Sequence, residues 1–189
     1  MAKASVTSAH PASVNPKPSD TLRFFTDSEY AARVAAATAV GVGVMRTDSV
    51  TSGTVTPQAG PAIHWYTVKF SVLDEQGHDI PIRIGKTDAQ NAGSSGFGFE
   101  HACSDHDMCS DHILSVIFAQ TPGSHTGTRY QYGGVIANPA SLQVVMAIVA
   151  SQDQSTKTQW GTTPDGRPMG LITAYCKNVE PCPSWVNSF

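Results

Sequence analysis

The sequence predicts an α+β domain in which an antiparallel sheet carries two or three helices packed on one face. Residues 63–73 and 79–85 place apolar side chains at every second position, which is the period of a strand. Residues 26–40 and 99–119 instead follow the three- and four-residue steps of a helix. A chain of 189 residues can bury one sizeable core, so we expect a single domain with terminal extensions.

The two ends of the chain differ in composition from its middle. Residues 1–20 are rich in Ser, Ala and Pro and show no periodicity, which is typical of an arm or a linker. Residues 21–175 carry the periodic segments and are expected to form the globular domain. Residues 176–189 contain prolines together with Trp185 and Phe189, so we expect an irregular tail that docks on the domain or on a neighbouring chain.

The first helix and the strands of the sheet have recognisable signals. Thr26 and Glu29 have the spacing of a capping box, and Gly41 and Gly43 end the helical pattern. The turn DEQGHD should join two strands as an antiparallel hairpin. Four segments are expected to build the sheet: residues 41–50, 63–73, 79–85 and 169–175.

Residues 140–151, ASLQVVMAIVAS, have two interpretations. Asn138 and Pro139 suit the N-cap and first position of a helix, which predicts a second buried helix over this segment. Its β-branched residues make a core strand the alternative. We expect the preceding TPGSHTGTRYQYGG to be a loop.

Composition argues against several classes of protein. The net charge is −3, and the 12 Lys and Arg residues form no run, so no nucleic-acid patch is evident. The longest apolar run, VVMAIVA, is far shorter than the roughly 20 residues of a membrane-spanning helix. The first residues lack the apolar core of a secretory signal, and no Walker loop or dinucleotide fingerprint is present.

The four cysteines form two pairs with equal spacing, Cys103 with Cys109 and Cys176 with Cys182. On an intact helix Cys103 and Cys109 lie about 9 Å apart along the axis. This exceeds the roughly 7 Å between Cα atoms that a disulfide tolerates. We therefore expect any disulfides to tie the tail to the central helix, with free thiols in a reducing compartment as the alternative.

The residues able to carry chemistry gather in residues 96–120, GFGFEHACSDHDMCSDHILSVIFAQ. Helical spacing places His106 on one apolar stripe with Phe99 and Ile113, which predicts an imidazole that fills the core. A second hypothesis gives His106 a chemical role, because an imidazole beside the carboxylate of Asp107 can activate a water as a general base.

A different face of the same helix predicts a metal site. His101, Asp105 and His112 follow one another at steps of four and seven residues, so one helix face presents all three side chains. Two imidazoles and a carboxylate can ligate one ion. His101, Asp105 and His112 are therefore candidate metal ligands. The more ordinary interpretation is a solvated helix face.

Residues 96–109 resemble the active-site helix of bacterial and fungal secreted phospholipases A2, which carry Gly-Phe-x-Phe-x-x-Ala-Cys-x-x-His-Asp. The matching residues are Gly96, Phe97, Phe99, Ala102, Cys103, His106 and Asp107. The resemblance implies that His106 is the general base for water and that Asp107 helps to hold a calcium ion. It also implies a mostly helical domain, which differs from the strands expected over residues 41–85.

Taken together, the sequence favours a structural protein that associates with copies of itself, such as a shell, coat or decoration subunit of a virion or another assembly. Three features support this hypothesis: the low charged fraction of 14%, the N-terminal arm and the aromatic tail. We expect a homo-oligomer whose chains contact each other through the arm and the tail. We expect no cofactor. The alternative is a calcium- or zinc-dependent hydrolase. It would use His106 and Asp107, or the candidate metal ligands.

Overall fold

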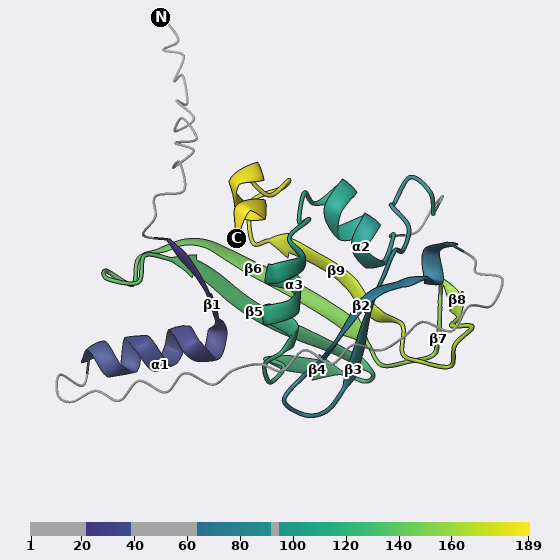
Figure 1. Ribbon diagram of the computed structural model, residues 1–189, viewed down its shortest axis with the longest axis horizontal. Helices are drawn as coiled ribbons and strands as arrows, with labels where there is room; N and C mark the ends of the chain where they lie inside the picture. The colour runs from purple at the N-terminus through teal and green to yellow at the C-terminus, as the bar shows by residue number, and fades with distance from the viewer. Residues whose placement is uncertain (1–21, 39–63, 92–94) are drawn as a thin grey trace, which may run out of the picture.

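The computed structural model describes residues 22–38, 64–91 and 95–189 (Figure 1). It confirms the α+β class, with an antiparallel five-stranded sheet at the centre in the order β1–β5–β6–β9 and β4 paired to β5. The strands of this sheet are β1 (Arg23–Thr26), β4 (Ser124–Thr126), β5 (Arg129–Ala137), β6 (Val144–Asp153) and β9 (Gly170–Cys176). Two smaller sheets pair β2 (Val68–Leu73) with β3 (Asp79–Arg83), and β7 (Lys157–Thr158) with β8 (Gly161–Thr162).

Helices and single helical turns lie against this framework. They are α1 (Asp27–Thr38), η1 (His64–Tyr66), α2 (Gly98–Glu100), the π-helical turn η2 (His101–Asp105), α3 (Asp111–Phe118) and η3 (Ser184–Ser188). Figure 1 shows α2, α3 and the β2–β3 hairpin on one side of the main sheet, with the C-terminal turn beside them. Within the described ranges, no helix combines the length and the apolar character that a bilayer span requires.

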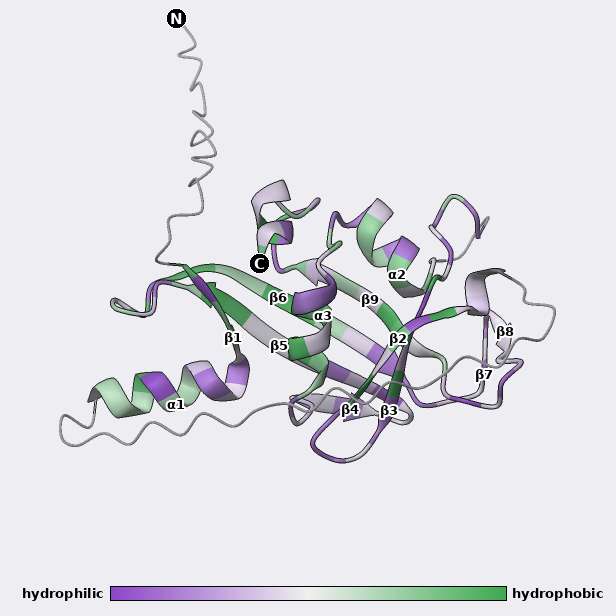
Figure 2. Ribbon diagram, viewed as in Figure 1, coloured by the Kyte–Doolittle hydropathy of each residue, from purple (hydrophilic) through white to green (hydrophobic). Residues whose placement is uncertain are grey.

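The core lies between α3 and the main sheet. Four side chains of α3 are fully buried there, namely Ile113, Leu114, Ile117 and Phe118. They pack with apolar residues of β3, β5, β6, β9 and the tail in one continuous cluster. Figure 2 shows hydrophobic stretches along β3, β5 and β6 in green. Complete burial of a large apolar side chain contributes about 1.5–3 kcal/mol to the stability of the fold. These four side chains therefore hold α3 against one face of the sheet.

The first helix confirms the predicted capping box. The Thr26 backbone N–H donates to Glu29 Oε2 at 2.9 Å, and the Glu29 N–H donates to Thr26 Oγ1 at 3.2 Å. The Tyr30 hydroxyl donates to the Leu142 carbonyl at 2.6 Å. No residue of α1 is buried, although α1 contacts β1 and β5.

The sheet differs from the sequence prediction in its membership. The β2–β3 hairpin forms as expected, but it pairs with itself alone and contacts β9 through β3. Residues 41–50 lie outside the described residues. Residues 124–134, expected as a loop, instead form β4 and most of β5. Pairing to β6 over the full length of β5 satisfies the backbone of this Gly-containing segment.

Residues 144–153 form a central strand, so the predicted helix over 140–151 is wrong and the alternative is correct. Asn138 does cap backbone N–H groups, because its Oδ1 accepts from Ala140 at 2.8 Å and from Ser141 at 3.1 Å. These bonds shape the turn of the β5–β6 hairpin, in which Leu142 has a positive φ of 56°. From Met146 to Ser151 the side chains of β6 then alternate between the buried and the half-buried face.

The predicted continuous helix over 99–119 is also wrong. The chain reverses after η2, where Asp107 takes a left-handed φ of 54°, and α3 starts afresh with Ser110 as its N-cap. The Ser110 hydroxyl accepts from the Ile113 N–H at 3.1 Å. The reversal brings Cys103 and Cys109 to a Cα separation of 4.4 Å, and they form a disulfide.

The second disulfide joins Cys176 to Cys182, so no disulfide ties the tail to the central segment. The expected attachment of the tail is made by hydrogen bonds instead. The Cys182 N–H donates to the His106 carbonyl at 2.8 Å, and the Ser110 hydroxyl donates to the Phe189 carbonyl at 2.6 Å. Trp185 and Phe189 pack against the main core.

A buried arginine holds the loop before β9 against β3. Arg83 is 0% exposed, and its guanidinium donates to both carboxylate oxygens of Asp165 at 2.9 and 3.0 Å. It also donates to the carbonyls of Tyr66 at 2.7 Å and Pro168 at 2.9 Å. Burial works to raise the pKa of Asp165, but the hydrogen bonds and the charge of Arg83 outweigh it and lower that pKa below its ordinary value.

We expect Asp165→Asn to lower the free energy of unfolding at pH 7 by about 2 kcal/mol, because it leaves the buried Arg83 charge without its carboxylate. The loss stays at this size because Asp165 is partly exposed and solvent screens the pair. A depressed carboxyl pKa stabilises the folded state above the ordinary Asp pKa of about 4, and this contribution disappears as the pH falls through the lower folded value. The difference in the free energy of unfolding between wild type and variant, measured by urea titration, should therefore become smaller below about pH 4.

The matched control is Asp111→Asn, which removes a surface pair with Lys69 at 3.2 Å whose carboxylate is 56% exposed. It should change stability by less than about 1 kcal/mol. Equal effects of the two substitutions would contradict the role given to Arg83.

Candidate functional site

An open pocket of about 390 Å³ lies where η2, the C-terminal half of β9 and the tail meet. Its lining comes from segments far apart in the chain: Asp88, Ser95, Gly96, His101, His106, Arg129, Ser151, Gln159, Trp160, Ile172, Thr173, Tyr175 and Glu180. Polar side chains dominate this list, and Ile172 is the one aliphatic side chain among the described residues that line the pocket. The pocket therefore suits a polar substrate better than a long acyl chain.

Two histidines face each other in this pocket. His101 begins η2 and is 5% exposed, whereas His106 follows its end, at the chain reversal, and is half-buried. Their ring planes cross at 74°, and the two Nε2 atoms lie 3.3 Å apart. A π-helical turn holds them five residues apart with converging rings, which is a feature often found at functional sites.

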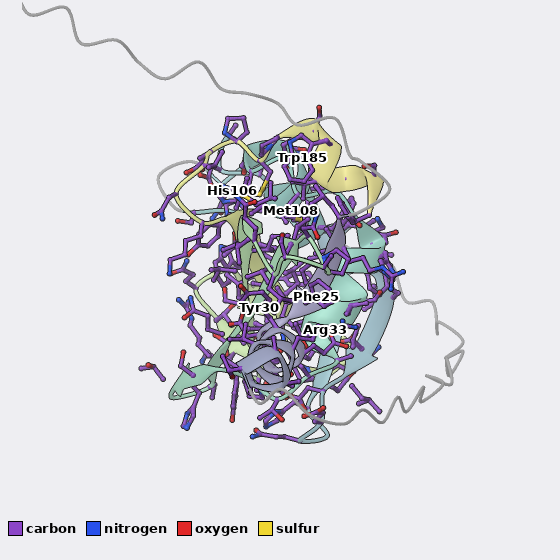
Figure 3. The ribbon with its side chains drawn as sticks, turned by 90° about the vertical axis from the view of Figure 1, so that its left-hand side faces the viewer. Phe25, Tyr30, Arg33, His106, Met108 and Trp185 are labelled. Carbon is purple, nitrogen blue, oxygen red and sulfur yellow. A yellow bond between two sulfur atoms is a disulfide. The ribbon has the colours of Figure 1, made fainter. Side chains whose placement is uncertain are left out.

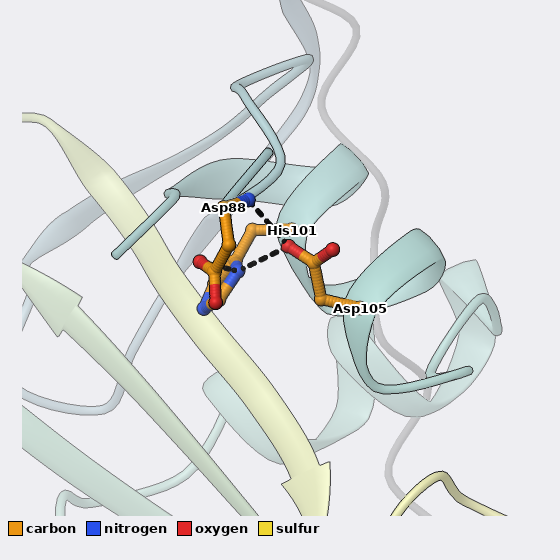
Figure 4. A group of neighbouring side chains, drawn as sticks. All are labelled: Asp88, His101 and Asp105. Carbon is orange, nitrogen blue, oxygen red and sulfur yellow. Dashed lines mark hydrogen bonds and ion pairs between the residues drawn. The ribbon is translucent and has the colours of Figure 1, made fainter. Parts of the chain in front are cut away.

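The Nδ1 atom of His101 is held by two carboxylates (Figure 4). It lies 2.8 Å from Asp105 Oδ2 and 3.2 Å from Asp88 Oδ1. The loop that carries Asp88 is fixed in turn, because the Asp88 N–H donates to Asp105 Oδ2 at 2.8 Å and the Gly96 N–H donates to Asp88 Oδ1 at 2.6 Å. These bonds orient the imidazole and leave its Nε2 directed at His106.

The Nδ1 atom of His106 is held from the opposite side. It lies 2.7 Å from Glu180 Oε1, in the C-terminal tail. The His106 ring also lies near Tyr175 of β9, with 5.9 Å between ring centroids. Both histidines therefore have the same arrangement, with Nδ1 on a carboxylate and Nε2 in the pocket.

The carboxylates favour one tautomer of each ring. An ionised carboxylate only accepts hydrogen bonds, so each Nδ1 carries a proton. With both Nδ1 atoms protonated, two neutral rings would direct Nε2 lone pairs at each other across 3.3 Å. One further proton between the Nε2 atoms converts this repulsion into a hydrogen bond. With such a proton, the His101–His106 pair would place an acid beside a base.

The carboxylate of Asp105 is tuned by the same contacts. Burial works to raise its pKa, but the hydrogen bonds from the His101 ring and the Asp88 N–H, together with the charges of both histidines, lower the pKa below its ordinary value. Asp105 therefore stays ionised well into the acid range. It can therefore keep accepting the hydrogen bond from His101 Nδ1.

Aromatic and cationic groups also line the pocket. Trp160 packs on Phe97 with 5.3 Å between ring centroids, and its indole N–H donates to the Ser95 carbonyl at 2.8 Å. The guanidinium of Arg129 lies 5.8 Å from the Trp160 ring centroid. Its Nε is 3.3 Å from Asp153 Oδ2, and the side chain is 55% exposed. An anionic group in the pocket would find this cation at the rim.

The two disulfides support the contact between His106 and Glu180. His106 lies inside the loop closed by Cys103–Cys109. Glu180 lies inside the loop closed by Cys176–Cys182. Each partner of the ion pair therefore stands on its own covalently closed loop.

The predicted site residues are brought together only in part. His101 and Asp105 are in contact as the helical spacing suggested, but the third group of this cluster is Asp88. His112 is exposed on α3 and is no member of it. The ring of His106 lines the pocket, so the prediction that this imidazole fills the core is wrong. The Asp107 carboxylate contacts Asn187, and the carboxylate beside the His106 ring is that of Glu180.

Sequence reasoning missed Asp88 and Glu180. Asp88 lies in a loop before the helical segment, and Glu180 lies 74 residues beyond His106. No local periodicity connects such positions. The signal that was available is the repeated six-residue separation of the cysteine pairs, which favours local disulfides and a chain reversal. Comparison with known proteins adds no further residues, because no family model, curated protein or solved structure matches the chain.

We expect the double substitution Cys176→Ala/Cys182→Ala to lower the free energy of unfolding by about 2 kcal/mol, since a closed loop of this short length restricts the unfolded chain only modestly. It should also shift the NMR signals of the His106 ring, because Glu180 loses its support. Thermal unfolding and ring spectra of the variant measure both effects. Unchanged His106 signals would contradict the supporting role of this loop.

Proposed function

We propose that the chain is an enzyme that cleaves phosphodiester bonds in RNA by general acid–base catalysis. One observation carries the proposal: the Nε2 atoms of His101 and His106 converge in an open pocket while each Nδ1 is anchored on a carboxylate. Such a pair supplies a base and an acid together, and proton transfer from positioned side chains contributes about 10²–10⁴-fold to a rate.

RNA suits this site because it carries its own nucleophile. The neutral imidazole takes the proton of a ribose 2′-hydroxyl, and the 2′-oxygen attacks the adjacent phosphorus. The bond from phosphorus to the 5′-oxygen breaks, and the imidazolium gives its proton to that oxygen. The products are a 2′,3′-cyclic phosphate and a free 5′-hydroxyl. The substrate enters by replacing the contact between the two Nε2 atoms.

Other groups in the pocket have matching roles. The Arg129 guanidinium can stabilise the charge that develops on the phosphoryl oxygens. The rings of Trp160 and Tyr175 offer surfaces for unstacked bases, which is how single-stranded RNA is commonly held. Since the chain has a net charge of −3, we expect recognition of a short single-stranded segment more than electrostatic capture of a long duplex.

Phospholipid hydrolysis, which the resemblance of residues 96–109 implies, has less support. That chemistry assigns Asp107 to calcium, but the Asp107 carboxylate accepts from Asn187 Nδ2 at 3.4 Å and its backbone carbonyl accepts from the same nitrogen at 2.9 Å. His106 Nδ1 is held by Glu180. The pocket also offers little aliphatic surface to an acyl chain.

We expect the oxidised protein to cleave a short single-stranded RNA in the presence of EDTA and to leave 2′,3′-cyclic phosphate ends. His101→Gln and His106→Gln should each lower the rate by about 100-fold or more. His112→Gln removes an exposed imidazole of the same segment and should leave the rate unchanged. Cleavage is followed by gel electrophoresis, and product ends by mass spectrometry.

A DNA strand of the same sequence is the matched substrate control, because it lacks the 2′-hydroxyl and should remain intact. Phosphatidylcholine vesicles with calcium form the second arm. Calcium-dependent release of fatty acid without RNA cleavage would overturn the proposal in favour of lipid hydrolysis.

Self-association in a shell or coat stays a prediction from the sequence, and one observation favours it. None of the residues of α1 is buried, and Val34 is 37% exposed on it. Figure 3 places Tyr30 and Arg33 of this helix far from His106 and Trp185. An interface through α1 would thus leave the pocket open, so association and catalysis are compatible.

We expect light scattering to give a mass above that of one 20.0 kDa chain if α1 is an interface, and Val34→Glu to shift that mass toward the monomer. The charge would be costly to bury in a packed contact. Ser104→Glu, at an exposed position outside α1, is the control and should leave the mass unchanged. A monomeric wild-type protein at high concentration would contradict association.

A further inference from the structure

We propose that the Nε2 atoms of His101 and His106 also form a binding site for one borderline divalent cation of the Zn²⁺ class, which takes the place of the proton between them. The inhibitory consequence drawn below rests on the proposed RNA cleavage, but the binding itself does not. The site uses the pocket side of both rings, so it differs from the metal site predicted on His101, Asp105 and His112.

The separation of the two nitrogens fits such an ion. Zinc binds imidazole nitrogen at about 2.0–2.1 Å in tetrahedral geometry, which places two ligating nitrogens about 3.3 Å apart. The Nε2 atoms of His101 and His106 lie 3.3 Å apart. The rings therefore need little movement to accept the ion, and the open pocket leaves its remaining coordination positions to water.

The partners of both rings favour metal binding. A histidine that ligates a metal commonly donates its other N–H to a carboxylate, which fixes the ring and makes the ligating nitrogen more basic. His101 has Asp105 at 2.8 Å and His106 has Glu180 at 2.7 Å in this role. These carboxylates, together with Asp88, also offset the charge of a divalent ion.

Asp88, His101 and Asp105 form a cluster that orients the His101 ring for this site. The cluster is not the metal site itself. Its Nδ1-to-oxygen distance of 2.8 Å is that of a hydrogen bond and is shorter than the separation of two ligands on zinc. Asp88 Oδ1 and Asp105 Oδ2 also already accept backbone N–H groups. A ligand set of imidazole nitrogens selects zinc, nickel or copper over magnesium and calcium, which prefer oxygen.

The ion would occupy the space between the Nε2 atoms, which the reacting groups of the RNA must also enter. ZnCl₂ should therefore inhibit RNA cleavage in competition with substrate. The titratable and charged groups around the two rings are Asp88, Asp105, Arg129, Tyr175 and Glu180. The carboxylates among them face the Nδ1 side of the rings.

Isothermal titration of the oxidised full chain with ZnCl₂ tests the proposal. We expect one ion per chain, no comparable heat with MgCl₂ or CaCl₂, and an affinity lowered by about tenfold or more in His101→Gln, His106→Gln and Glu180→Gln. His112→Gln should bind as the wild type does. Because the substitutions could disturb folding, ¹⁵N NMR of the wild-type imidazoles provides a second measurement, in which ZnCl₂ should shift the Nε2 signals of His101 and His106.

Absence of zinc binding, binding that persists in His106→Gln, or zinc-induced shifts at Nδ1 of His101 would each overturn this site. The outcomes separate the two proposals. Zinc binding at Nε2 without RNA cleavage would support the site and refute the proposed enzyme, whereas RNA cleavage without zinc binding would do the reverse.

Discussion

A chain reversal between His106 and Ser110 determines where the groups of the pocket lie. A continuous helix would carry His106 into the core beside Phe99 and would separate Cys103 from Cys109. The left-handed backbone of Asp107 ends the π-helical turn instead. The Cys103–Cys109 disulfide and the hydrogen bond from the Cys182 N–H to the His106 carbonyl hold the reversal in place. The ring of His106 consequently meets His101 in front and Glu180 behind.

The surroundings of the two imidazoles place different requirements on their Nδ1 and Nε2 atoms. The carboxylates fix a proton on each Nδ1, which leaves two lone pairs facing each other unless a cation stands between them. A proton, the hydrogen of a reacting hydroxyl and a borderline metal ion all meet this need. The acid–base role and the metal binding that we propose for the pocket therefore have one electrostatic cause. It lies in the arrangement of the carboxylates more than in the histidines alone.

Local rules predicted the local features of the fold, and long-range contacts decided the rest. The capping box of Thr26 and Glu29 and the β2–β3 hairpin depend on neighbours in the sequence, and both form. Residues 144–153 satisfy helix and strand signals alike, and pairing with β5 decides in favour of the strand. The helical spacing correctly joined His101 to Asp105. It failed beyond the reversal, because no local pattern shows that Asp107 leaves the helix or that Asp88 and Glu180 approach from distant segments.

Both disulfides connect cysteines only six residues apart. The entropy lost on closing a loop grows with its length, so each cysteine meets its native partner more readily than either distant one. Oxidation of the unfolded chain should thus produce mostly native pairs with little need for reshuffling by an isomerase. The loop that carries His106 and the loop that carries Glu180 can therefore each form their disulfide independently, before the tail docks on the domain.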